Sequence, residues 1–375
     1  MMNKGLYIHL PFCKHICSYC DFAKRVSKAS IQEKYISALI QELLMYQEEG
    51  FDYHQITTLY IGGGTPTALS LNLLRKLLET LSSLLDLKNL QEFTIEANPE
   101  DLSEELSVLL NSFAVTRVSI GIQSFNKRIL KLLNRSFDEA HFIKEYQFLH
   151  QLIPNINFDL MYAIPSQTVQ ELKETLVKAI ELKPDHLSIY SLILEEKTLF
   201  HHMVTTGQLE LISEDLEMAM VQLIDEMVIP QYPKYEVSNY ANAKHQSLHN
   251  LGYWNNLEYL GVGLSAASYL NGVRFQNTKD LKTYLESIAN HKFPISEREV
   301  LSKYQEKQYH LILGFRKCEG INLDNYMMRF HSLIYQDFSE LYEFLQLGYF
   351  EEIDGFIRVK PQYFYVMNYL LERII

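Results

Sequence analysis

The chain has 375 residues, enough for two or three average domains or for one α/β barrel with an addition. Hydrophobic residues make up 47% of the chain and charged residues 21%, a globular composition that excludes a disordered protein. The formal net charge is −12, so we expect no nucleic acid among the partners, because binding to phosphates favours the opposite sign.

The apolar run at residues 6–10 is closed by Pro11 and is too short for the core of a signal peptide. The sequence contains no run of about 18 uncharged apolar residues, the length that a membrane-spanning helix needs. We therefore predict a cytoplasmic protein without a transmembrane segment.

Short β-rich runs alternate with helical patterns up to about residue 190, as in βα units around a parallel sheet. We expect helices at residues 31–47, opened by a capping box of Ser30 and Glu33, and at 71–85, which carries a leucine stripe. Six strands are too few for the usual eight-stranded closure. We predict an α/β fold with an open, partial (β/α)6 barrel, or else a doubly wound sheet, with the site at the carboxyl ends of the strands. The expected strands are residues 6–9, 58–61, 92–96, 117–120, 157–160 and 186–190.

We divide the chain into a barrel with a cysteine loop (1–200), an extension and connecting segment (201–295) and a helical, winged-helix-like domain (296–375). The last part contains a hairpin whose expected turn is Asp354-Gly355. It carries nine Lys and Arg against twelve Asp and Glu, so we expect a packing or protein-contact role rather than DNA binding.

Three of the four cysteines, Cys13, Cys17 and Cys20, form a CxxxCxxC loop after the first expected strand. In a chain without an export signal, this cluster points to metal or redox chemistry. Structural zinc uses four protein ligands, and only His15, inside the loop, is at hand. Three thiolates on a 4Fe–4S cluster would leave one iron open to another molecule. A zinc site and three cysteines without metal remain as alternatives.

The cysteine loop resembles the hallmark of the radical SAM family, which lies at the mouth of a partial barrel. The resemblance implies a 4Fe–4S cluster, S-adenosylmethionine chelating the open iron, and an electron donor for its cleavage to a 5′-deoxyadenosyl radical. The GGGTP run at residues 62–66 matches a family element that contacts the methionyl amino group. Aromatic residues beside the loop, Tyr7, Tyr19 and Phe22, are expected to shield the cluster.

Further runs, at residues 120–125, 134–135 and 159–165, resemble the coproporphyrinogen-dehydrogenase-like branch of this family. In that branch the matching Glu, Gln, Arg and Asp contact S-adenosylmethionine. The residues expected to bind this cofactor are therefore Tyr7, Tyr19, Gly63, Gly64, Thr65, Glu96, Gln123, Arg135 and Asp159.

Two groups in this branch share the fold: oxygen-independent coproporphyrinogen III dehydrogenases, and haem chaperones without that activity. The dehydrogenase has a fourth cysteine where Phe22 stands here, and an N-terminal extension, whereas six residues precede Tyr7. Residues 249–254, His-Asn-Leu-Gly-Tyr-Trp, match the chaperones' HNxxYW motif. The resemblance thus implies a haem chaperone that binds haem through His249 and passes it to an acceptor protein.

The runner-up is the dehydrogenase or another radical SAM enzyme that acts on a tetrapyrrole, and a zinc-binding interaction module comes third. His245 is either a second haem ligand or a neighbour of His249. Ala267 stands where many chaperones have a histidine in a Gly-Ala-His-Ser run, which implies weaker haem binding or other ligands here. Cys318 is expected to be a small buried residue.

Overall fold

The computed structural model describes residues 4–375, and its main feature is one open, mixed sheet with the strand order β11-β10-β9-β8-β1-β2-β3-β4-β5-β6-β7. Six consecutive parallel strands form its middle, and each coincides with a predicted strand. The open, partial barrel is therefore confirmed. These strands are β1 (Lys4–Leu10), β2 (Ile56–Gly63), β3 (Glu92–Ala97), β4 (Arg117–Gln123), β5 (Ile156–Tyr162) and β6 (His186–Ser191).

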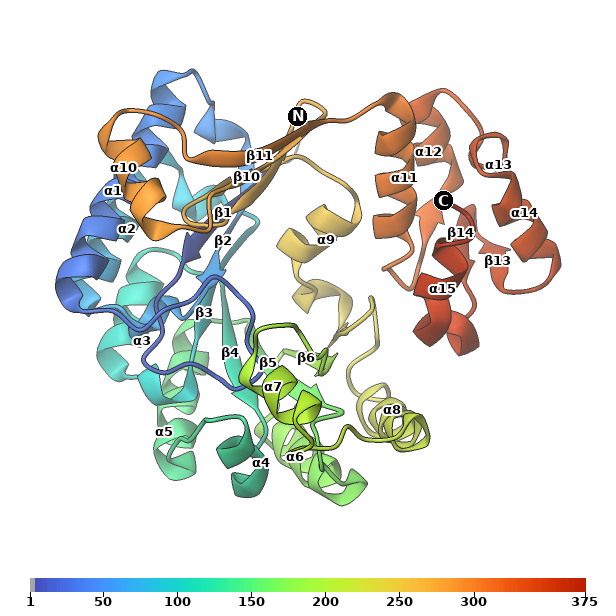
Figure 1. Ribbon diagram of the computed structural model, residues 1–375, viewed down its shortest axis with the longest axis horizontal. Coiled ribbons are helices and arrows are strands. Elements are labelled where there is room, and N and C mark those ends of the chain that lie inside the picture. The colour runs from blue at the N-terminus through green and yellow to red at the C-terminus, as the bar shows by residue number, and fades with distance from the viewer. Residues whose placement is uncertain (1–3) are drawn as a thin grey trace.

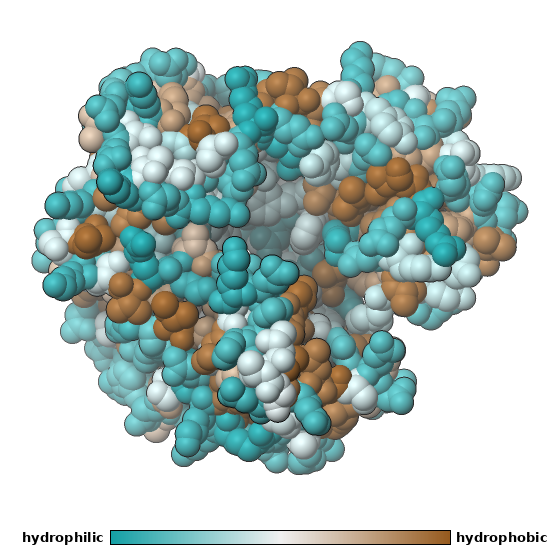
Figure 2. All heavy atoms as spheres, viewed as in Figure 1, coloured by the Kyte–Doolittle hydropathy of each residue, from teal (hydrophilic) through white to brown (hydrophobic). Residues whose placement is uncertain are grey.

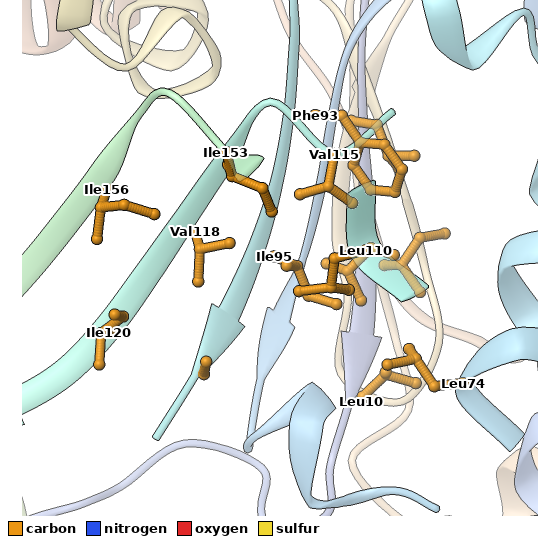
Figure 3. Close-up of a cluster of buried hydrophobic side chains, with 14 of the residues drawn as sticks. Leu10, Leu74, Phe93, Ile95, Leu110, Val115, Val118, Ile120, Ile153 and Ile156 are labelled. Carbon is orange, nitrogen blue, oxygen red and sulfur yellow. The ribbon is translucent and has the colours of Figure 1, made fainter. Parts of the chain in front are cut away.

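Helices cover the outer face of this curved sheet (Figure 1). Leu6, Ile8 and Leu10 alternate along β1 and are fully buried toward the helices, because successive side chains of a strand point to opposite faces. Figure 3 shows the same layer in β3 and β4, where Ile95 and Val118 pack with Leu110. The covering helices are α1 (Ala29–Glu48), α2 (Leu71–Leu84), α3 (Glu104–Ser112), α5 (Glu139–Leu152) and α6 (Val169–Leu182), whereas α4 (Lys127–Leu132) packs in a separate cluster with Met161 and Phe200.

The intervening residues of the same strands give the barrel a polar interior. In β3, Phe93 and Ile95 lie on the outer face, so Glu92, Thr94 and Glu96 lie on the inner one. Asn157 and Asp159 occupy the inner positions of β5 in the same way. The parallel strands therefore alternate, instead of being apolar on both faces as in most parallel sheets.

Of the two predictions about individual helices, one is confirmed and one is wrong. The leucine stripe of α2 is confirmed, since Leu74, Leu77, Leu78 and Leu81 are fully buried, and Leu85, just after the helix, is buried too. The predicted capping box of α1 is wrong. This helix begins at Ala29 with Lys28 at its N-cap position, which places Ser30 inside the first turn.

The sheet continues at both edges in a way that the alternation of strands and helices did not predict. β7 (Asn239–Ala241) pairs antiparallel with β6, and β8 (Tyr259–Val262) pairs parallel with β1. The predicted boundary at residue 296 falls inside β11, and the division into domains stays a prediction. The other elements of this part are β9 (Ala267–Leu270), β10 (Val273–Asn277), β11 (Ile295–Val300), α7 (Leu199–Thr205), α8 (Glu214–Val228), α9 (Leu248–Trp254) and α10 (Leu281–Ala289).

Residues 303–375, here called the C-terminal unit, have a hydrophobic core of their own beside the large sheet (Figure 1). Asp354 and Gly355 have φ angles of 52° and 78°, as a type I′ turn requires, so the predicted hairpin turn is confirmed. Cys318 is half-buried, and the winged-helix likeness stays a prediction. The unit contains α11 (Lys303–Gly314), α12 (Leu323–Phe330), α13 (Ile334–Asp337), α14 (Ser339–Gln346), α15 (Met367–Leu371), β12 (Ile321–Asn322), β13 (Phe350–Ile353) and β14 (Phe356–Val359).

Candidate functional site

The three clustered cysteines border one cavity of about 330 Å³ at the carboxyl ends of the parallel strands, which we call the smaller cavity. Most of the predicted cofactor residues border it too. Burial raises the pKa of the Cys13 thiol to about 11, so this thiol is protonated in the metal-free chain. From the predicted set, the smaller cavity brings together Cys13, Cys17, Cys20, Tyr19, Gly63, Gly64, Thr65, Glu96, Gln123, Arg135 and Asp159.

The donor set around this cavity fits an iron–sulfur cluster with one open iron. It consists of three soft thiols, whereas the fourth cysteine, Cys318, lies in the C-terminal unit. Across residues 4–375, no three His, Cys, Asp or Glu side chains are grouped as ligands of a single metal ion. The thiols instead share a cavity that also has room for an organic ligand.

The glycine loop after β2 is held against the cysteine loop by backbone contacts. Gly64 donates its N–H to Leu10 O over 2.8 Å, and Thr65 donates to Phe12 O over 2.7 Å. A Cβ atom on Gly64 would lie only 2.7 Å from Phe12 O. Gly63 has a φ of 111°, which favours glycine, and a Cβ there would meet the ring of His9. These glycines are therefore required by the close approach of two loops.

A chain of polar contacts connects the predicted residues Arg135 and Thr65 through Asn98, which the sequence analysis missed. Arg135 Nη2 donates to Asn98 Oδ1 over 2.6 Å, and Asn98 Nδ2 donates to Thr65 Oγ1 over 3.0 Å. At the two ends, Thr65 Oγ1 and Arg135 Nη1 each lie 3.9 Å from a cysteine sulfur, of Cys13 and Cys17 respectively. The available signal was the position of Asn98, directly after β3 and before Pro99.

Two half-buried carboxyl groups, Glu96 and Asp159, border the smaller cavity from the barrel interior. Glu96 accepts hydrogen bonds from Tyr60 Oη at 2.8 Å and from the Gly63 N–H at 3.0 Å, and burial raises its pKa to about 7. Asp159 accepts from Ser119 Oγ at 3.0 Å, and burial raises its pKa as well. Glu96 therefore exchanges its proton near neutral pH.

Gln123 reaches the same cavity through an irregular strand end. Its φ is 65°, a left-handed conformation that is uncommon for a residue other than glycine. The pairing of β4 with β5 shifts register between Gly121 and Gln123. Such irregularities commonly re-aim a side chain beside a functional site. Here the irregularity places Gln123 on the cavity wall.

A second cavity, of about 630 Å³, adjoins the first, and we call it the larger cavity. The two cavities share Phe22, Gly63 and Glu96 as a common wall. Figure 2 shows the surface hollowed at the centre of this face, between the large sheet and the C-terminal unit. The larger cavity is lined among others by Tyr7, Tyr253, Trp254, Ala267, Arg274 and Leu313. Tyr7 thus lies in a different cavity from the cysteines.

His249 lies in α9, beside the amino-terminal ends of β1 and β2, and only 2% of it is exposed. Its Nδ1 is hydrogen-bonded to Thr58 Oγ1 at 2.9 Å, and its Nε2 to Tyr253 Oη at 2.8 Å. Burial lowers the pKa of the imidazole to about 3, so the ring is neutral. In this conformation both ring nitrogens are engaged, unlike those of a histidine open to iron. His245 instead faces Asp185, at 3.9 Å.

Comparison with known proteins places this chain in a family. The model of the radical SAM superfamily matches residues 7–179. The chain is 40% identical to the heme chaperone HemW of Lactococcus lactis over 326 residues, which cover 86% of this chain and 84% of that relative. The chain belongs to the HemW family. A HemW relative from Bacillus subtilis is 35% identical over 323 residues, or 85% of each protein.

The HemW-family chain also shares its fold with a solved structure. It superimposes on coproporphyrinogen III oxidase (HemN) of Escherichia coli, a radical SAM enzyme, with a TM-score of 0.84 and 22% identity, covering 99% of this chain and 89% of that one. The predicted resemblance to radical SAM proteins of this branch is thereby confirmed. Among the helices of residues 4–375, none combines the length and apolar character needed to cross a bilayer.

Proposed function

We propose that this HemW-family chain holds a 4Fe–4S cluster on Cys13, Cys17 and Cys20, binds S-adenosylmethionine in the smaller cavity and carries haem in the larger one. The observation that carries this proposal is the pair of cavities with a common wall. Tyr253 and Trp254 of the HNxxYW motif line the larger of the two. The relatives' name, heme chaperone, supports haem as the cargo.

In the smaller cavity, the chain supplies polar groups on several sides of a bound S-adenosylmethionine. The cluster, when reduced, would supply one electron. Glu96 and Asp159 are acceptors for the amino and hydroxyl groups of such a molecule, and Gln123 is both donor and acceptor. Arg135 places its positively charged guanidinium group beside Cys17, with Nη1 at 3.9 Å from the sulfur. Tyr19 lies on the same wall and shields it from water.

In the larger cavity, the chain offers aromatic surfaces to a flat macrocycle. A volume of about 630 Å³ is within the range of cofactor sites. Tyr253, Trp254 and Tyr259 provide rings that can pack against a porphyrin. His249 holds the hydroxyl group of Tyr253, so it orients this wall. Direct ligation of haem iron by His249 stays a prediction, and it requires α9 to shift.

A second candidate function is that of a coproporphyrinogen III dehydrogenase, because the chain shares the fold of HemN. Phe22 occupies the position at which the resemblance implies a fourth cysteine in that enzyme. Its side chain is 65% exposed and borders both cavities. We therefore favour the chaperone function. We propose that the chaperone acts in the cytoplasm with an electron donor and a haem-acceptor protein.

The decisive experiment is a haem titration of the anaerobically reconstituted protein, followed by mixing with an apo-haem protein as acceptor. We expect a saturable change in the Soret absorption and transfer of haem to the acceptor. A parallel assay contains coproporphyrinogen III, S-adenosylmethionine and a reductant. Sustained formation of the decarboxylated product would show a dehydrogenase, and a titration without saturable binding would refute the haem carrier.

A further inference from the structure

Arg274 is a half-buried cation on the wall of the larger cavity, in the middle of β10. Throughout the part of the chain that the structure describes, no carboxylate comes within ion-pair distance of its guanidinium group. An unpaired charge that is partly removed from water is unfavourable. In a chain with a net charge of −12, a cation left without an anionic neighbour requires an explanation.

The guanidinium group is held in place by neutral groups from three other segments. Its Nη2 donates to Asn256 Oδ1 over 2.8 Å. Its carbon Cζ lies 4.0 Å from the ring centroid of Tyr309 in α11 and 4.6 Å from that of Tyr269 in β9. Stacking on aromatic rings orients arginine without neutralising its charge. Arg274 is therefore positioned as an anion-binding group would be.

A second donor on the same wall is also unused. Asn256 is only 2% exposed, and its Oδ1 is occupied by Arg274. Considering residues 4–375, its Nδ2 has no hydrogen-bond partner, and neither has Arg274 Nε. Buried polar groups without partners are rare in folded proteins and call for a ligand or a water. Arg329 of α12 fixes Asn256 by donating to its carbonyl oxygen over 3.0 Å.

We infer that Arg274 and Asn256 form a carboxylate subsite, which holds a propionate group of the porphyrin carried in the larger cavity. This inference rests on the proposed haem function and names how the cargo is recognised. Guanidinium and amide N–H groups together match the two oxygens of a carboxylate. Lys279, exposed on the same cavity, adds a second positive charge. The aromatic residues Tyr253 and Trp254 then face the macrocycle, and the cations Arg274 and Lys279 face its propionate groups.

The test compares haemin with iron protoporphyrin IX dimethyl ester, which lacks the two negative charges. Reconstituted wild type, Arg274→Gln and Asn256→Leu are titrated with both ligands. Arg298→Gln is the matched control, because Arg298 lies exposed on the neighbouring strand β11, where it pairs with Phe275. We expect wild type to bind haemin ~10 to 100-fold more tightly than the ester, as for one charge-assisted contact. Arg274→Gln removes this preference, Asn256→Leu reduces it, and Arg298→Gln keeps it.

The comparison of the two ligands on wild type does not depend on the folding of any variant. Equal affinity of wild type for haemin and the ester would overturn the carboxylate subsite while leaving haem binding intact. Binding of neither ligand would instead refute the proposed function, and the subsite with it. An Arg274→Gln variant that folds, as judged by circular dichroism and iron content, and keeps the preference for haemin would also overturn the assignment.

Discussion

Gly63 donates its backbone N–H to Glu96 Oε2 over 3.0 Å, and this bond joins the glycine loop to β3 at the wall between the two cavities. The other oxygen of Glu96 accepts a hydrogen bond from the hydroxyl group of Tyr60. A single carboxyl group thus holds a loop and a tyrosine at the boundary between the two cavities. Its replacement tests whether this wall organises cofactor binding.

Glu96→Gln is expected to weaken S-adenosylmethionine binding by about tenfold, or about 1.4 kcal/mol. The amide keeps one acceptor oxygen, but it presents an NH₂ group where the carboxylate accepts a hydrogen bond, and it removes the negative charge. Equilibrium dialysis on the reconstituted protein measures the affinity. Glu105→Gln, on the exposed face of α3, is the control. Equal affinity in both variants would contradict a role of Glu96 in the site.

Gly64→Ala is expected to lower the iron and sulfide content obtained on reconstitution. The added Cβ lies within 3 Å of backbone atoms of Phe12, so the glycine loop must move away from the cysteine loop, at a cost of ~1–3 kcal/mol. Gly252→Ala in α9 is the matched control, since its Cβ meets no atom within 4 Å. Similar iron content in the two variants would show that the contact between the loops does not position the cysteines.

Stability is expected to depend on pH through Glu42, which is fully buried beneath the sheet extension. It accepts hydrogen bonds from Tyr284, Asn277 and Gly263, and burial raises its pKa to about 7. The unfolded group has a pKa of about 4.3. Because the folded pKa is the higher one, the stabilising effect is complete below pH 4 and is lost as the pH rises through 7.

Comparison with Glu42→Gln isolates this contribution from those of other buried carboxyl groups. Between pH 5 and pH 8, wild type should lose roughly 2–3 kcal/mol of unfolding free energy relative to the variant. Denaturant unfolding of both proteins at several pH values measures the difference. Parallel pH profiles would show that Glu42 does not carry the predicted titration.

Ala267→His is expected to tighten haem binding by about tenfold and to change the haem spectrum. Ala267 is exposed at the start of β9 and lines the larger cavity, so an imidazole there faces the proposed cargo. Ala140→His, on an exposed position of α5, controls for an added surface histidine. Unchanged spectra and affinity in Ala267→His would place the haem iron away from β9.

His249→Ala is expected to weaken haem binding, and the position of the Soret maximum of the complex reports whether the imidazole also ligates the iron. In this structure His249 acts through Tyr253, whose hydroxyl group it holds at 2.8 Å on the cavity side of α9. Tyr253→Phe, which removes the same hydrogen bond, should reproduce much of the loss. A shifted Soret maximum in His249→Ala, absent from Tyr253→Phe, would show that the imidazole ligates the iron.

The strands and the cysteine site were predictable because their signals are local. Alternation along β1 to β6 marks each strand, and CxxxCxxC and GGGTP place the two loops after β1 and β2. The start of α1 was misplaced because Ser30 and Glu33 have the spacing of a capping box although the helix already begins at Ala29. Sequence spacing alone does not show at which of two neighbouring residues a helix begins.

The contacts that were missed join segments distant in the sequence. β8 lies beside β1 more than 200 residues away, so no local pattern announces that pairing. Arg274 is held in position by Asn256, Tyr269 and Tyr309, which come from three different segments of the chain. We predicted that Tyr7 borders the cofactor site because Tyr7 comes shortly before the cysteine loop in the sequence. Since successive side chains of β1 point to opposite faces, its ring instead lies on the wall of the larger cavity.

Helix α9 is fastened at both ends to different parts of the molecule. At its start, Glu92 of β3 accepts the Leu248 N–H over 2.6 Å, and at its end Arg329 of α12 donates to the Asn255 and Asn256 carbonyl oxygens. The helix therefore connects the start of β3 to the C-terminal unit. Any movement of that unit away from the barrel would have to break the Arg329 contacts or pull on the helix that carries His249.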